Sequence, residues 1–200
     1  KASDLVGLDF LVHILGQMNL TYIVAQVGQE FHVVDQHTVH ERVLFERLWR
    51  NWLEKDVQSQ ALLIPEPVDV QPHSAVLLES ALPELEKLGL EMEPFGKASF
   101  VMRSVPALLG QMDYAALVQD LIDDLSEWKS LDSIEKRIRP ILASMACQGA
   151  VQAGRVMAEP EMKVVLEDWV KEGFPMTCPH GRRVAMRFSI EELHRIFQRI

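Results

Sequence analysis

The stretch TYIVAQVGQEFHVVDQHTVHERVLFERLWRNWLEK, residues 21–55, changes its hydrophobic period at Gln36. Before Gln36, the β-branched and aromatic runs at 21–27 and 31–34 flank the short segment 28–30, GQE, which is the pattern of a β-hairpin. From Gln36 to the end of the stretch there is no Gly or Pro, and apolar residues recur at helical spacing, which predicts one long helix. A hairpin that leads directly into a long helix indicates an α+β fold.

The rest of the chain continues this mixture. We expect further strands over residues 60–70, 100–105 and 183–188, and further helices over residues 72–88, 114–128, 134–151 and 160–170 and from residue 190 onward. Pro65 and Pro67 confine the first of these strands to a sheet edge or a bulge, because proline cannot donate to a β-ladder. Pro140 is expected to kink or divide the helix over 134–151.

The composition is that of a globular chain. Of its 200 residues, 48% are apolar and 24% are charged, which suits one or two packed domains and excludes fibrous, collagenous and low-complexity proteins. No segment approaches the roughly 18 to 20 uncharged apolar residues that span a bilayer, and the start, KASDLVGLDF, has no signal core. We therefore expect a soluble, cytoplasmic protein without a membrane partner. The first residue is Lys1 rather than methionine, which suggests a fragment of a longer protein.

The charge argues against tight, autonomous binding of nucleic acid. The chain carries 20 basic and 29 acidic side chains, and its net charge of -9 has the wrong sign for a broad phosphate-binding surface. The charge is uneven, however, because carboxylates dominate residues 113–136 and arginines dominate residues 182–199. The arginine-rich end could approach a phosphate, although a solvated helix face and surface solubility are the simpler explanations of the two clusters.

A histidine and a carboxylate share one face of the predicted long helix. His37 and Glu41 lie one turn apart, where an imidazole and a carboxylate can ligate a single cation, although such pairs also form simple surface ion pairs. The same face continues with the apolar side chains of Leu44, Leu48 and Trp52. We therefore expect this face to be buried, and a buried carboxylate needs a partner. Asp35, directly before the helix, could reach the same site or act as the helix N-cap.

A second group of ligand-type residues lies far downstream, in the segment TCPHGRR, residues 177–183. Cys178 and His180 flank Pro179, and the stiffened turn would present a thiolate and an imidazole together. The only other thiol, Cys147, lies among small residues, and two cysteines make no disulfide scaffold. The candidate ligands are therefore two imidazoles, two thiolates and one carboxylate: His37, Glu41, Cys147, Cys178 and His180. This set suits zinc, or two adjacent metals with an open position, whereas the alternative is buried cysteines and surface histidines.

Three motifs follow one another along the chain: DQHTVHERVLFE at residues 35–46, ACQ at 146–148 and CPHGRR at 178–183. They resemble the D-Q-H-A-x-x-E-x-x-x-x-E helix, the Ala-Cys motif and the Cys-Pro-His-Gly-Arg-Pro segment of the C-terminal, endonuclease-bearing domain of the MutL mismatch-repair family. The departures are Thr38 for alanine, Gln148 for a basic residue or histidine, and Arg183 for proline. With the strand-like QMNLTYIVA at residues 17–25, the resemblance runs from about Gly16 to the C-terminus.

The resemblance implies a function in DNA mismatch repair. It implies a metal-dependent endonuclease domain that nicks one strand of DNA, forms a homodimer and works with other mismatch-repair proteins. By similarity, Asp35 and Glu41 are the positions essential for cleavage, and the zinc-binding positions are His37, Glu41, Cys147, Cys178 and His180. A thiolate-rich shell weakens zinc as a Lewis acid, so zinc would be structural or regulatory, and manganese or another divalent ion would serve cleavage.

Two other functions stay open on the sequence. Some members of the family keep the dimerisation fold without the metal motif, so the chain could be a non-catalytic dimerisation and partner-docking module with a structural zinc site. It could also be a zinc-stabilised structural domain unrelated to DNA. The orientation of Asp35, toward a cap or toward the metals, would discriminate between the endonuclease and the docking module. For the endonuclease, the acidic balance predicts weak nicking and weak, non-specific DNA binding by the isolated domain.

The predicted ligands also imply the domain organisation. Residues 35–41 must meet residues 147 and 178–180 in space, so we expect two lobes, with the site and the dimer interface in a lobe built from both chain ends. This lobe would comprise residues 1–59 and 141–200, and residues 60–140 would form an inserted external, regulatory lobe.

The segment QALLIP, residues 60–65, resembles the peptide by which MutL proteins engage the replication sliding clamp. Its matching residues are Gln60, Leu63 and Pro65. An extended, apolar segment stiffened by proline suits docking into a hydrophobic groove, and the alternative is a buried edge strand.

Overall fold

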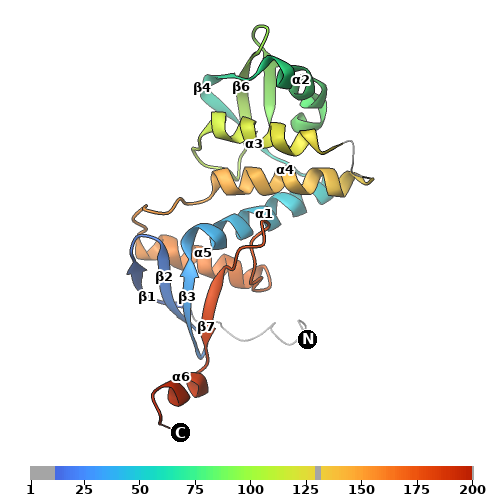
Figure 1. The fold of residues 1–200 in the computed structure, drawn as a ribbon. Helices are drawn as coiled ribbons and strands as arrows, with labels where there is room; N and C mark the ends of the chain where they lie inside the picture. The colour runs from blue at the N-terminus through green and yellow to red at the C-terminus, as the bar shows by residue number, and fades with distance from the viewer. Residues whose placement is uncertain (1–11, 129–131, 200) are drawn as a thin grey trace. The chain divides into compact units, whose positions relative to one another are not determined.

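In the computed structural model of the chain, residues 12–128 and 132–199 are described, and they form a mixed α and β fold, as predicted (Figure 1). The chain divides into two compact units, and each is described by itself. The first unit comprises Lys1–Val43 and Ala150–Ile200, and the second unit comprises Leu44–Gly149. The lobe limits expected from the sequence, 1–59 with 141–200 and 60–140, stay a prediction, and residues 1–11 lie outside the described part.

The first unit is built on a four-stranded antiparallel sheet with the strand order β1-β2-β3-β7. Its elements are β1 (Val12–Met18), β2 (Tyr22–Val27), β3 (Glu30–Asp35), α5 (Glu159–Lys171), β7 (Ala185–Phe188) and α6 (Ile190–Ile196). The predicted hairpin is confirmed, since Val27 lies opposite Glu30. Gly28 in the tight turn has a φ of 60°, a left-handed conformation that glycine adopts without steric cost.

Helix α5 packs on one face of this sheet, and the core of the first unit lies between them. Ile23 and Val34 point to this side and are fully buried, as is Trp169 of α5. The indole Nε1 of Trp169 donates to the carbonyl oxygen of Pro175 at 2.8 Å, so its polar group has a partner inside the core. The alternation of buried and exposed residues along β2 therefore fixes which side of the sheet faces solvent.

The opposite side of the sheet is turned away from the core and is largely apolar, with the exposed polar residues Gln26 and His13 at one end. Strand pairing places Val24 opposite Val33 and Val33 opposite Met186. In the next row, Phe31 lies opposite Phe188, with the ring centroids 6.3 Å apart. We call this surface the outer face, defined by Leu15, Tyr22, Val24, Phe31, Val33, Met186 and Phe188, of which Leu15 is 55%, Met186 50% and Tyr22 37% exposed.

The second unit contains a three-stranded antiparallel sheet with the order β4-β6-β5. Its elements are β4 (Ser59–Asp69), α2 (Pro72–Glu86), β5 (Glu91–Pro94), β6 (Ser99–Pro106), α3 (Tyr114–Ser126) and α4 (Ile134–Gly149). Helix α1 (Gln36–Glu54) begins in the first unit and ends in the second. Helix α4 runs unbroken past Pro140, so this proline does not divide the helix, and the kink expected as the other outcome stays a prediction. None of the helices in the described residues has the length and apolar character that a bilayer crossing needs.

The middle of β4 leaves the ladder. Its register with β6 shifts between Ala61 and Glu66, so the four residues Leu62–Pro65 face a single residue of β6. The proline that ends this segment has no N–H to donate, which explains why pairing stops here. We call Leu62–Pro65 the β4 bulge; within it Leu63 is 103% and Ile64 78% exposed. The predicted edge strand with a bulge is confirmed, and the alternative of a buried strand is wrong at these two side chains.

Candidate metal centre

Asp35 ends β3 and caps α1. Its Oδ1 accepts the backbone N–H groups of His37 and Thr38, each at 3.0 Å, which are donors that a helix start leaves without a partner. Of the two roles left open for Asp35, the helix N-cap is therefore the one that these hydrogen bonds show. The cap uses one carboxylate oxygen, since Oδ2 takes part in neither bond, and the metal role of Asp35 stays a prediction.

The first turn of α1 is anchored to Val151. Nδ1 of His37 lies 3.1 Å from the carbonyl oxygen of Val151, and Nδ1 of His40 accepts the N–H of the same residue at 3.0 Å. The first of these bonds requires the His37 proton on Nδ1, so Nε2 is the ring nitrogen with a lone pair. This Nε2 lies 3.8 Å from Oε2 of Glu41. The histidine is thereby held in one tautomer with its lone pair beside the carboxylate.

Glu41 is a fully buried carboxylate with a partner at each oxygen. Nδ1 of His180 lies 2.6 Å from Oε1, and Nη2 of Arg182 donates to Oε2 at 3.1 Å. An unpaired carboxylate in this position would carry a large desolvation cost, so these partners are what allow Glu41 to be buried. The expectation that this face of α1 is buried is confirmed, and Glu41 does not form a simple surface ion pair.

The segment 177–183 reaches Glu41 because it folds into a closed turn. Thr177 and Arg183 form an isolated antiparallel bridge, and inside it the N–H of Cys178 donates to the carbonyl oxygen of Arg182 at 2.8 Å. Gly181 has a φ of 81°, which only glycine adopts without strain, and its N–H donates back to Cys178 at 2.9 Å. Cys178 is thereby buried, whereas the side chain of His180 is 43% exposed.

The donor set fits zinc. Glu41, Cys178 and His180 each offer one ligand atom, and these three atoms lie within 4.8 Å of one another. A carboxylate, a thiolate and an imidazole are typical zinc ligands. Cys147 lies in the last turn of α4, in the second unit, and is half-buried. Its role as a ligand stays a prediction, as do the roles of the other residues.

Arg182 is the part of this centre that the sequence analysis missed. It counted there only as one arginine among several near the end of the chain. In the structure its Nη2 lies 3.1 Å from Oε2 of Glu41 and 3.3 Å from Nε2 of His37. The signal that could have found it is the buried carboxylate, because a buried glutamate is almost always paired and Arg182 belongs to the same short motif as His180.

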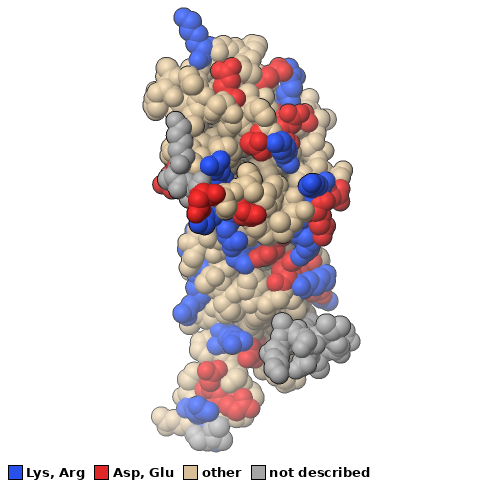
Figure 2. Space-filling model, turned by 90° about the vertical axis from the view of Figure 1, so that its right-hand side faces the viewer, with Lys and Arg blue, Asp and Glu red and all other residues tan. Residues whose placement is uncertain are grey.

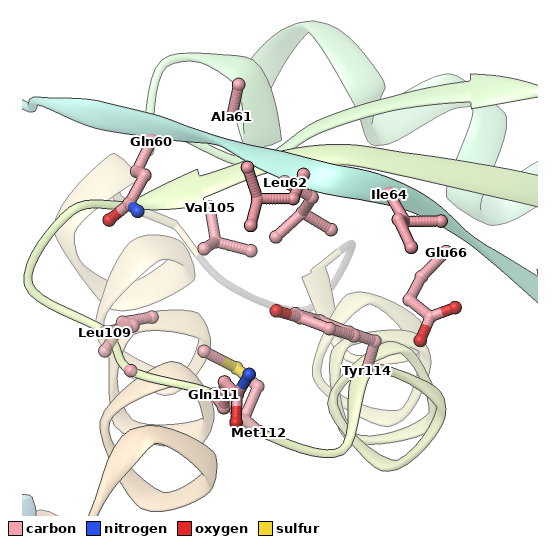
Figure 3. Close-up of a pocket in the computed structure, with 12 residues that line it drawn as sticks. Gln60, Ala61, Leu62, Ile64, Glu66, Val105, Leu109, Gln111, Met112 and Tyr114 are labelled. Carbon is pink, nitrogen blue, oxygen red and sulfur yellow. The ribbon is translucent and has the colours of Figure 1, made fainter.

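A second candidate site surrounds the β4 bulge in the second unit. The three residues expected to contact a sliding clamp, Gln60, Leu63 and Pro65, are all exposed. A pocket of about 540 Å³ lies against this strand, and Figure 3 shows Leu62 and the ring of Tyr114 bordering it from opposite sides. Residues 60–64, Glu66, Val105, residues 109–112 and Tyr114 line the pocket. The clamp role of these residues stays a prediction.

Comparison with known proteins gives one consistent result. Residues 15–157 match the family described as "MutL C terminal dimerisation domain". The DNA mismatch repair protein MutL of Paramagnetospirillum magneticum is 40% identical over 183 residues, which are 92% of this chain and 30% of that protein. MutL of Rhodospirillum rubrum is 40% identical over 185 residues, and MutL of Phenylobacterium zucineum is 39% identical over 183 residues, each covering 92% of this chain and 29% of that protein. The chain thus spans about 30% of the length of these relatives.

Proposed function

The chain belongs to the MutL family of DNA mismatch-repair proteins, through its C-terminal dimerisation domain, and from this we propose that it nicks one strand of DNA at the cluster around Glu41. The observation that carries the proposal is the burial of Glu41 together with an imidazole and a thiol whose ligand atoms lie within 4.8 Å. Three different metal-binding side chains converge here from segments more than 130 positions apart, which supports a metal centre at this place.

The residues of the first unit have distinct roles in this proposal. Glu41, Cys178 and His180 would hold zinc, with His37 beside them and Cys147 as a further ligand. When bound, a divalent ion supplies a water of lowered pKa and neutralises charge on the phosphate; manganese suits this work better than a thiolate-bound zinc, which would be structural or regulatory. Asp35 would supply the second carboxylate needed for cleavage, and its two bonds to the start of α1 keep that carboxylate from rotating.

DNA binding by this chain is expected to be weak and non-specific. The net charge is -9, and Figure 2 shows acidic and basic side chains interspersed on the face drawn. Arg183, in the turn that carries His180, is exposed, whereas Arg187 lies farther along β7 with its Nη1 3.7 Å from Oε2 of Glu30, so few phosphate contacts are available near the proposed centre. Few contacts give low affinity that decreases further with salt. We therefore expect efficient nicking to need the rest of a MutL protein, other mismatch-repair proteins and a sliding clamp.

The β4 bulge is the proposed docking segment for that clamp. Packing of the second unit does not explain why Leu63 and Ile64 stand fully or largely in water. An extended segment with exposed apolar side chains can insert them into a hydrophobic groove, and a partner would then bury the area that the fold leaves exposed.

A second copy of the chain is the proposed partner of the outer face. The matched family is described as a dimerisation domain, and the outer face groups apolar side chains from neighbouring strands on the sheet of the first unit. Dimer interfaces are more apolar than the rest of a protein surface, and a two-fold interface uses the same patch on both copies.

The experiment that tests the proposed function is nicking of supercoiled plasmid in manganese, with and without sliding clamp. We expect Glu41→Gln to abolish nicking, because the isosteric amide cannot act as an anionic ligand. Glu54→Gln, at the exposed end of the same helix, is the control and should nick as the wild type does. Dimerisation, measured on the same preparations, shows whether each variant is folded, and zinc content shows whether the centre still binds metal.

Nicking by Glu41→Gln at the wild-type rate would contradict the proposed centre. No nicking by the wild type in any condition, with zinc bound and the dimer intact, would instead favour the non-catalytic dimerisation and docking module.

A further inference from the structure

Arg182 occupies the point where two proposed metal-binding groups converge. Its Nη2 lies 3.1 Å from Oε2 of Glu41 and 3.3 Å from Nε2 of His37, and these two atoms are 3.8 Å apart. A guanidinium has no acceptor, so Arg182 must be the donor in both contacts. One nitrogen of a permanent cation is therefore held between a carboxylate oxygen and an imidazole lone pair.

We propose that Arg182 is a built-in competitor of the metal, a cation that neutralises Glu41 and must swing away before a divalent ion uses Glu41 and His37 together. The proposal rests on the metal centre described above. Two ligand atoms on one tetrahedral zinc lie about 3.4 Å apart, close to the spacing that Oε2 and Nε2 already have. The arginine nitrogen and a metal ion would thus need the same two lone pairs and nearly the same place.

The contact is strong enough to compete. Oε2 belongs to a fully buried carboxylate, and a charge-assisted hydrogen bond to such a group is stronger than one between neutral partners. Removing the arginine would leave the negative charge of Glu41 with less compensation, which raises its attraction for any other cation. Arg182 therefore weakens metal binding by a free energy comparable to that of its own hydrogen bond to Glu41.

Displacement of Arg182 requires little rearrangement. Its side chain is 54% exposed, so the guanidinium can move into water without opening the core. The backbone of the turn is held independently of that side chain, by the Thr177 to Arg183 bridge and by the hydrogen bond from the Cys178 N–H. The ligands Cys178 and His180 can therefore keep their places while the arginine leaves.

The test is zinc affinity, measured on the purified chain by competition with a chromophoric chelator. Arg182→Gln should bind zinc about 10-fold or more tightly than the wild type, the range expected when a hydrogen bond to a charged group stops competing. Arg183→Gln is the matched control, because it removes the same charge from the same turn at an exposed side chain; its affinity should be unchanged. In the presence of chelator and without zinc, Arg182→Gln should unfold at a lower temperature than the wild type, and added zinc should abolish this difference.

Two results would overturn the proposal in distinguishable ways. Zinc affinity of Arg182→Gln equal to or below that of the wild type would overturn the competitor role and leave the metal centre standing. Failure of the wild type and of Arg182→Gln to bind zinc would overturn the zinc centre and this proposal with it, whereas the proposed nicking is decided separately by the plasmid assay in manganese.

Discussion

Asp35 combines two demands in one side chain, since it caps α1 and is the proposed second carboxylate of the nuclease. Asparagine is as good an N-cap as aspartate, whereas alanine at such a position costs about 1 kcal/mol of stability. Asp35→Asn should therefore unfold at the wild-type urea concentration and yet fail to nick supercoiled plasmid. Asp35→Ala should unfold at a lower urea concentration than the wild type and should also fail to nick.

Comparing Asp35→Asn with Asp35→Ala separates the role of Asp35 in cleavage from its role as a cap. Wild-type nicking by Asp35→Asn would show that the negative charge is not used, and Asp35 would then be a cap and nothing more.

His32 is a buried histidine outside the proposed centre. It is fully buried in the first unit, with the rings of Trp169 and Phe174 at centroid distances of 6.1 Å and 5.4 Å. Burial lowers the pKa of His32 below its ordinary value; Glu30, whose Oε2 lies 3.3 Å from Nε2, opposes this shift, and Arg187 adds to it. The neutral imidazole is therefore the form that the core favours.

The lowered pKa of His32 predicts a pH-dependent stability. Above the ordinary histidine pKa of about 6.5, neither the folded nor the unfolded chain binds this proton, and the contribution of His32 is fully present. As the pH falls below that value toward the folded-state pKa, the unfolded chain binds the proton first, so the free energy of unfolding decreases by up to about 1.4 kcal/mol per pH unit. Urea unfolding of the wild type and His32→Phe at about pH 7.5 and about pH 5.5 measures this effect.

The phenylalanine variant should lose less stability on acidification than the wild type, because it has no proton to bind. Equal losses in the two proteins would show that other groups account for the acid sensitivity.

Among the elements, the β4 bulge is the one where a substitution should change partner binding without changing the stability of the fold. Leu63 is entirely exposed, so Leu63→Ala should change the free energy of unfolding by less than about 0.5 kcal/mol, as surface substitutions usually do. The same change should abolish binding to an immobilised sliding clamp. Val76→Ala, at a 72% exposed position of α2, removes a comparable exposed side chain and should bind as the wild type does. Clamp binding that survives Leu63→Ala would assign docking to another surface.

Sequence reasoning found the elements whose pattern is local. The hairpin and α1 were predicted within a residue or two, because period, glycine placement and the absence of prolines lie within each segment. β5, Glu91–Pro94, was missed, since its residues EMEP carry no strand pattern and it forms only by pairing with β6. β1 was recognised only in part, because its register shifts between Ile14 and Gly16 and interrupts the alternation.

The candidate centre was predictable in its residue types and unpredictable in its contacts. Glu41, Cys178 and His180 could be grouped because few side chains in the sequence have that chemistry. Two contacts could not be foreseen: Arg182 at Glu41, and the bond between His37 and Val151. They depend on side-chain conformations and on pairings more than 100 positions apart, which periodicity does not encode.

For the whole molecule, the outer face predicts a homodimer that a single charged substitution should dissociate. Met186→Glu places a carboxylate on the outer face beside Val33, and the position is 50% exposed, so folding should be little affected. Sedimentation velocity should show the wild type as a dimer and Met186→Glu as a monomer. Val76→Glu, which adds the same charge to the second unit, should remain dimeric. A dimeric Met186→Glu would move the interface elsewhere.

The discontinuity of the first unit has a consequence for the nascent chain on the ribosome. β3 is completed by β7, with Phe31 opposite Phe188, and Glu41 and His180 are 139 positions apart. The second unit lies between them in the chain and can fold as it emerges, whereas the first unit must wait for the last turn and strand to be translated. A chain terminated before residue 178 carries Glu41 without its histidine, thiol and arginine partners. Completion of translation is therefore the step that brings these residues together.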